Sequence, residues 1–398
     1  MEAAPDPAGI EAKISWIQAE MRDFFEDEQA HHPTAADKAT LEAFLTSTKT
    51  CIARPGEVEY LDDHDAKLAL VSQVGASVPG MQGAAFWSAL WTMPAGDVGK
   101  LLGELRTRSG PEKIRLCDPL ERAVKRRLPQ LIRIFRGLYE RDPYGDGLAA
   151  MDDNAGSERN EIERFIALQR DGNKCVIEDI GYPKVCHIFP LASIEQRYQR
   201  ITKACLDELQ SLWGRERALR LADKLFNSGA GQTAVVDTAA NMICLGATLR
   251  KWWYMGLFAL EPMEKPQPLD AAGSAQGAAS QQRWGIRLRF HWLKRTDIPD
   301  LNAAVDFSED PVPKMQEPEG RCMIFNATTC RPTESGQVFT VTADDPDKLP
   351  DYDILLLQWD LLRIWRLAGG ADPAVCYPFD SDDGGEDSQP TGSTRFYG

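Results

Sequence analysis

The chain lacks the segments that mark several large classes of protein. Its 398 residues contain no run of about eighteen apolar residues, so no membrane-spanning helix and no membrane partner are expected. The N-terminus has no basic segment followed by an apolar core, which argues against secretion. The nine cysteines form no Cys-x-x-Cys pair and their number is odd. We therefore expect reduced thiols in an intracellular protein, cytoplasmic or nuclear.

Basic residues are also scarce relative to acidic ones. The 45 Lys and Arg are outnumbered by 60 Asp and Glu, which gives a net charge of −15 and counts against a general nucleic-acid binder. Residues 112–141 run against this trend, with nine Lys or Arg and four acids. A solvated helix face and a local binding patch are both interpretations of this stretch.

The patterning divides the chain into three parts. Residues 1–150 are predicted to be a helical region, because apolar side chains recur every three or four residues. Helices are expected at about 10–24, 36–47, 64–75, 83–107 and 112–141, the last broken or kinked at Pro119 and Pro129. A Gly- and Asp-rich linker leads to a second domain at 160–373. Residues 374–398 form an acidic tail that is predicted to be disordered.

The second domain is predicted to mix strands with helices. We expect an antiparallel hairpin over 174–190, turning at Gly181 and Pro183, and a helix over 246–255 packed against it. Further strands are predicted in "WGIRLRFHWL" and "GQVFTVTADD", before an apolar helix in "YDILLLQWDLLRIWRL". The fold class is therefore predicted to be α+β.

Only five histidines occur, and His187 follows a cysteine at the start of an apolar strand. Hydrolysis of a phosphodiester needs a base that takes a proton from water, and an imidazole that titrates near neutrality suits that task. Asn241 follows later in the chain and is suited to orient the imidazole or to pin a loop. The alternatives are that His187 is an ordinary core residue and that Asn241 caps the segment after it.

Several stretches together resemble the fungal HNH-endonuclease-domain proteins. They are "RDGNKC" leading into "CHIFPLA", then "NMICLGATLRKWW", "FALEP", "LRFHWL" and "LLLQWDLLRIWRLAGGAD". The resemblance covers roughly residues 160–373. It implies a ββα-metal (HNH) core embedded in a largely helical chain, and nucleic acid as the partner.

The resemblance assigns roles to four residues. His187 matches the first histidine of HNH, the general base, and Asn241 matches the central asparagine. Arg250 occupies the position of the third histidine, where a metal ligand is expected, and Cys186 matches a further ligand position. An arginine has no free lone pair for a metal, so Arg250 is predicted to contact phosphate instead. A divalent ion (Mg²⁺, Mn²⁺ or Zn²⁺) is implied for an active enzyme, and possibly none otherwise.

Two functions remain open at this point. The first is an HNH endonuclease that hydrolyses nucleic acid with His187 as base, and the second is a catalytically inactive HNH-fold protein that binds or regulates. We predict that His187, Asn241 and Arg250 converge in one cleft, and that divalent ions bind weakly or not at all. Cys175 and Cys186 are expected to be buried thiols on neighbouring strands. Glu178, Asp179 and His291 are alternative ligands.

Overall fold

A computed structural model describes the residues 61, 63–136, 161–190, 196–226, 235–269, 282–316 and 324–370. The predicted helices near residues 10–24 and 36–47, the linker at 141–160 and the tail at 374–398 lie outside this set. The described part contains both helices and strands, so the chain is mixed α+β. No helix in it has the length and apolar character needed to cross a bilayer.

The first described helices build an apolar core around two tryptophans. They are α3 (His64–Ser77), η1 (Pro79–Met81), α4 (Ala84–Thr92) and α5 (Ala95–Thr107). The single helix expected over 83–107 is divided, because Met93 is extended ahead of Pro94 and a residue before proline disfavours helical geometry. Every residue of α4 is buried, and Trp87 and Trp91 are completely so.

A continuous helical segment follows, with an irregular turn in its middle. It consists of α6 (Gly110–Arg122), the π-helical turn η2 (Ala123–Arg127) and α7 (Leu128–Phe135). Pro119 lies inside α6 and Pro129 lies in the first turn of α7, yet neither ends the segment. The π turn lies between the two prolines, where the Leu128 N–H reaches back five residues to the carbonyl of Ala123. The predicted break is therefore replaced by a local widening of the helix.

Four α-helices, two short 3-10 turns and the two strands of a ribbon come next. They are α8 (Glu161–Arg170), β1 (Lys184–His187), α9 (Gln196–Trp213), α10 (Arg215–Phe226), η4 (Val235–Asp237), η5 (Ala239–Asn241), β2 (Met242–Leu245) and α11 (Ala247–Tyr254). Gly214 separates α9 from α10 with a φ of 85°, a left-handed conformation that glycine adopts without strain. β1 pairs antiparallel with β2, and α11 contacts β1. These elements occur in the order strand, strand, helix.

A second sheet lies in the last third of the chain. Its strands are β3 (Phe258–Pro262), β4 (Gln267–Leu269), β5 (Arg283–Trp292) and β8 (Val338–Ala343). The long strand β5 pairs antiparallel with each of the other three. The remaining short elements are η6 (Val312–Lys314), β6 (Phe325–Asn326), β7 (Arg331–Pro332) and η7 (Pro346–Lys348). The strands predicted in "WGIRLRFHWL" and "GQVFTVTADD" are confirmed.

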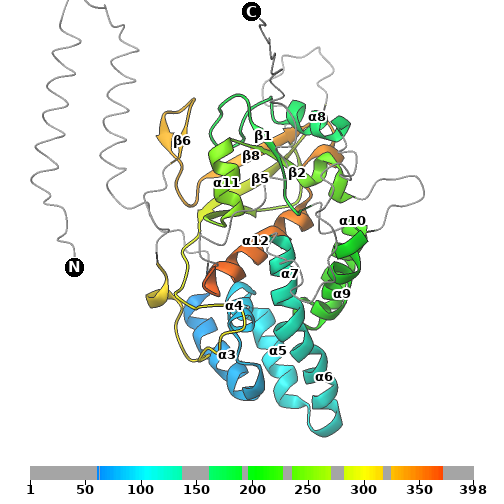
Figure 1. Cartoon of the computed structure of the whole chain (residues 1–398), viewed down its shortest axis with the longest axis vertical. Coiled ribbons are helices and arrows are strands. Elements are labelled where there is room, and N and C mark those ends of the chain that lie inside the picture. Colours follow the sequence, from blue (N-terminus) through cyan, green and yellow to red (C-terminus); the bar gives the residue numbers. More distant parts are fainter. Residues whose placement is uncertain are drawn as a thin grey trace, which may run out of the picture. The chain divides into compact units, whose positions relative to one another are not determined.

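The helix α12 (Tyr352–Leu367) joins the sheet to the helices that precede residue 136. It contacts β3 on one side and α4, α7 and α10 on others, as its course in Figure 1 indicates. Asp351 caps its N-terminus by accepting the N–H groups of Asp353 (3.0 Å) and Ile354 (3.1 Å). Residues from Gly56 onward form one compact unit, in which α4 and α12 share a core.

Candidate functional site around His187

His187 is the last residue of β1 and lies opposite Met242 of β2. Its strand partner is therefore not the segment 174–179, as the predicted hairpin required. The hairpin prediction is wrong in its pairing, because β1 finds its partner more than fifty residues later in the chain. The side chain of His187 is half-buried at the end of the ribbon.

The two faces of the β1–β2 ribbon are covered by different helices. Cys186 on one strand and Ile243 on the other belong to the main core, together with Leu249 and Trp253 of α11. The opposite face forms a smaller cluster that α8 covers, made of Ala167, Val185, Ala239, Met242 and Cys244. Because side chains alternate along a strand, His187 shares the face of Met242, and Cys186 points to the side of α11.

Asn241 is completely buried and clamps the loop that follows His187. Its amide nitrogen donates to the carbonyls of Phe189 and Val236, each at 2.8 Å, and its oxygen accepts the N–H of Phe189 at 2.8 Å. The backbone adds a bond from the Ile188 N–H to the carbonyl of Asn241, also 2.8 Å. The Asn241 amide thus joins the segment after β1 to the segment before β2, and it fixes the position of the chain immediately after His187.

Arg250 lies in the middle of α11 and is half-buried. Its guanidinium carbon is 5.5 Å from the centre of the Tyr254 ring, one turn further along the helix. The structure therefore brings Asn241 directly beside the end of β1, whereas Arg250 belongs to the helix that covers the Cys186 face. Alternation along β1 directs His187 toward the α8 side, and the convergence of all three side chains in one cleft stays a prediction.

The Cys186 position does not fit a metal ligand. Its side chain is only 4% exposed, and the thiol donates to the carbonyl of Lys184 at 3.5 Å. Within the described ranges, no three His, Cys, Asp or Glu side chains are grouped closely enough to hold an ion. A hydrolytic metal site needs several such ligands. We therefore derive no catalytic step through a metal.

The alternative ligands are committed to other contacts. His291 lies on β5 in the other sheet, is 1% exposed, and contacts the carboxylate of Glu261 at 2.9 Å. Asp179 pairs with Lys174 at 2.9 Å and with the Thr328 hydroxyl. None of these contacts joins the residue to His187.

Residues 174–181 form a tight turn and not the predicted strand. The Cys175 N–H donates to the carbonyl of Ile180 (2.9 Å), and the Asp179 N–H donates back to the carbonyl of Cys175 (2.9 Å). The buried Cys175 thiol accepts the N–H of Glu178 at 3.3 Å, and burial raises the pKa of Cys175 to about 11. Burial also raises the pKa of Glu178, whose carboxylate lies against Gly246 at the start of α11. Cys175 is buried as expected, but in a turn.

A buried ion pair holds β2 and the turn before it in place. This pair was not predicted from the sequence. Arg170 and Asp171 bond at 2.7 Å with side chains that are 1% and 0% exposed. Arg170 also donates to the carbonyls of Ala239 and Met242, each at 2.8 Å, and Asp171 accepts the N–H of Cys244 at 2.9 Å. The "RDGNKC" stretch thus anchors β2 and the turn before it. The only sign of this ion pair in the sequence is that Arg170 and Asp171, with opposite charges, are neighbours.

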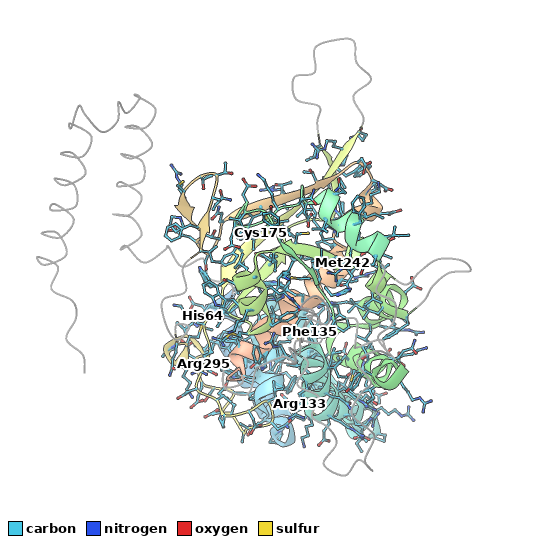
Figure 2. The ribbon with its side chains drawn as sticks, turned by 45° about the horizontal axis from the view of Figure 1, so that its top comes forward. His64, Arg133, Phe135, Cys175, Met242 and Arg295 are labelled. Carbon is cyan, nitrogen blue, oxygen red and sulfur yellow. The ribbon has the colours of Figure 1, made fainter. Side chains whose placement is uncertain are left out.

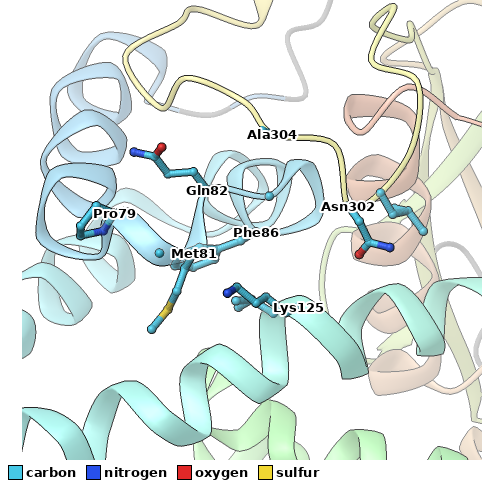
Figure 3. A pocket seen from close by; sticks show the side chains of 11 residues that line it. Pro79, Met81, Gln82, Phe86, Lys125, Asn302 and Ala304 are labelled. Carbon is cyan, nitrogen blue, oxygen red and sulfur yellow. The ribbon is translucent and has the colours of Figure 1, made fainter.

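Two hollows among the described residues are lined by other side chains. One of about 500 Å³ is bounded by Met81, Phe86, Lys125 and Asn302 (Figure 3). The other, about 380 Å³, lies between Phe165 of α8 and the end of β8. Neither is lined by His187, Asn241 or Arg250, and the Nε2 atom of the half-buried His187 is itself buried.

Comparison of the chain with family models, curated proteins and solved structures finds no match. The HNH assignment therefore stays a prediction from the residues themselves.

Proposed function

We propose that this chain is an HNH-endonuclease-like protein that acts on phosphodiester bonds in nucleic acid inside the cell. The observation that carries the proposal is the Asn241 clamp on the loop after His187. The order β1, β2 and α11 supports it, because it is the strand, strand, helix order that the resemblance implies. A buried side chain that makes two hydrogen bonds to Phe189 in this loop, and a third to Val236, indicates that the position of the loop matters.

In this proposal His187 acts as the general base. Its imidazole accepts a proton from water as the water oxygen attacks phosphorus, and the ester oxygen leaves with a proton from solvent. Arg250 contributes positive charge toward the phosphate through its paired N–H groups. Because Arg250 belongs to the helix on the other face of the ribbon, it would contact a neighbouring phosphate and not the one attacked by His187.

The test is nicking of a supercoiled plasmid in the presence of Mg²⁺, Mn²⁺, Ni²⁺ or Zn²⁺. We expect wild type to nick and His187→Ala to lose at least 100-fold of the rate, since a positioned base contributes about 10²–10⁴-fold. His64→Ala is the matched control, because His64 lies on α3 and contacts Asp310. Equal nicking by wild type and His187→Ala would exclude His187 as the base.

A second candidate is a catalytically inactive HNH-fold protein that binds or regulates. The buried Cys186 thiol favours it, since that residue faces the main core at the position where a ligand is expected. This candidate predicts that wild type binds nucleic acid without nicking it in any of the four metals. Calorimetry with Mn²⁺ and Zn²⁺ on wild type and Arg250→His completes the comparison. Metal binding and nicking that appear only in Arg250→His would identify a nuclease core that lost its metal at this position.

A further inference from the structure

The continuous helical segment carries a concentration of positive charge that the site at His187 does not use. From residue 122 to 136 the chain has six basic residues and no acidic one, although its net charge is −15. They are Arg122, Lys125, Arg126, Arg127, Arg133 and Arg136. Two of them serve the fold: Arg136 is buried over the Trp365 ring at 4.1 Å, and Lys125 pairs with Glu121 at 2.6 Å.

Arg126 and Arg133 are different, because both are exposed. They are seven residues apart, which is about two helical turns and about 10 Å along the axis. They therefore project from the same side of the segment. Leu128, Leu131 and Ile132, which lie between them in sequence, are completely buried on the other side.

The helix α9 extends this surface. The Arg127 guanidinium donates to Glu208 at 2.8 Å, and the Cys205 thiol contacts the Gln130 side chain at 3.7 Å. Residue numbers thus fall along α9 as they rise along α7, so the two helices are antiparallel. Arg200 lies just over one turn before Cys205, alongside the end of α7 that carries Arg133, and it is exposed.

These three arginines have no ionic partner among the residues that the structure describes. No carboxylate in the described part of the chain forms an ion pair with Arg126, Arg133 or Arg200. Glu208 lies between the two helices, but it is already shared by Arg127 (2.8 Å) and Arg122 (3.5 Å). The surface therefore keeps a net positive charge, which attracts an anionic partner.

We propose that Arg126, Arg133 and Arg200 form a docking face for the phosphate backbone of a nucleic acid. The class of ligand rests on the proposed function, and the placement rests on the arginines. A guanidinium binds phosphate oxygens through paired N–H donors, and a double-stranded nucleic acid presents a closely spaced row of such phosphates. Figure 2 shows Arg133 well apart from Met242, which lies opposite His187 in β2. This face would bind the nucleic acid at a distance from His187, where hydrolysis is proposed to occur.

The experiment measures binding without cleavage. Full-length protein is titrated in EDTA into a labelled 20-base-pair DNA duplex, and into the RNA duplex of the same sequence, at 50–200 mM KCl. Arg126→Ala/Arg133→Ala should bind at least 10-fold more weakly at the lowest salt. The plot of log affinity against log salt has a negative slope, and its magnitude should decrease by about 0.9 per lost contact, hence by about 2 for this double variant. Arg200→Ala should lower it by about 1, and Glu208→Gln should strengthen binding.

Lys265→Ala/Arg331→Ala is the matched control, since both residues are exposed and the charge change is the same. Its salt slope should equal that of wild type. Equal weakening in the two double variants would overturn the proposal, as would a wild type that binds neither duplex. Binding to phosphatidylserine vesicles but to neither duplex would also overturn it. A wild type that binds the duplexes with the expected salt dependence but never nicks would retain the docking face while the proposed catalysis fails.

Discussion

Replacing Asn241 by alanine removes the clamp on the loop after His187 and leaves three backbone groups without their partner. These are the N–H and carbonyl of Phe189 and the carbonyl of Val236. Both residues are completely buried. A buried group that loses its hydrogen bond costs about 1–3 kcal/mol. Allowing for partial relaxation, we expect Asn241→Ala to lower the free energy of unfolding by about 3 kcal/mol.

Urea unfolding followed by tryptophan fluorescence measures this loss. It is large against the total stability of about 5–15 kcal/mol typical of a folded protein. The matched control is Asn302→Ala, because Asn302 is exposed, and its effect should stay within about 0.5 kcal/mol. A loss below about 1 kcal/mol in Asn241→Ala, or equal losses in the two variants, would refute the clamp.

The aspartate variant tests the direction of the same bonds. Asn241→Asp keeps an acceptor for the Phe189 N–H but turns a carboxylate toward two carbonyl oxygens. The protonated acid can donate to one of them, so the folded state raises the pKa of this carboxyl above its unfolded value of about 3.9. The variant is thus most stable below that pH and loses stability as pH rises through the folded pKa. A pH-independent difference from wild type would contradict this reasoning.

Three further changes probe other contacts. Asp171→Asn should cost about 3–5 kcal/mol in urea unfolding, because it leaves a buried arginine without its counter-charge. Gly246→Ala should cost only about 1 kcal/mol, because the atom that its Cβ would meet at 2.0 Å is the far end of the flexible Glu178 side chain, and adding Glu178→Ala should restore most of the loss. The hydrogen bond with Asp310 raises the pKa of His64. The stability from that pair is present below pH 6.5 and lost as pH rises through the folded pKa, which an NMR titration of wild type and Asp310→Asn can follow.

The sequence by itself determined the elements whose signal is local. Apolar alternation identified β5 and β8, because the side-chain period of two is a property of each strand alone. The long apolar run before Gly369 identified α12, a helix buried almost throughout. The helix predicted over 246–255 is also confirmed, as α11.

Only the tertiary structure decided which strand pairs with β1 and which face each side chain takes. The apolar run around Cys175 resembled a strand, but left-handed residues at Gly172 and Asn173 begin a tight turn there. β1 then pairs with a strand beyond two helices, a contact between distant residues that no local pattern encodes. That pairing turns Cys186 into the core and His187 to the other side, and it makes Asn241 a clamp on backbone. Because side chains alternate along a strand, Cys186 and His187 must point to opposite faces of the ribbon. Only the packing of the helices decides which of the two faces is buried in the main core.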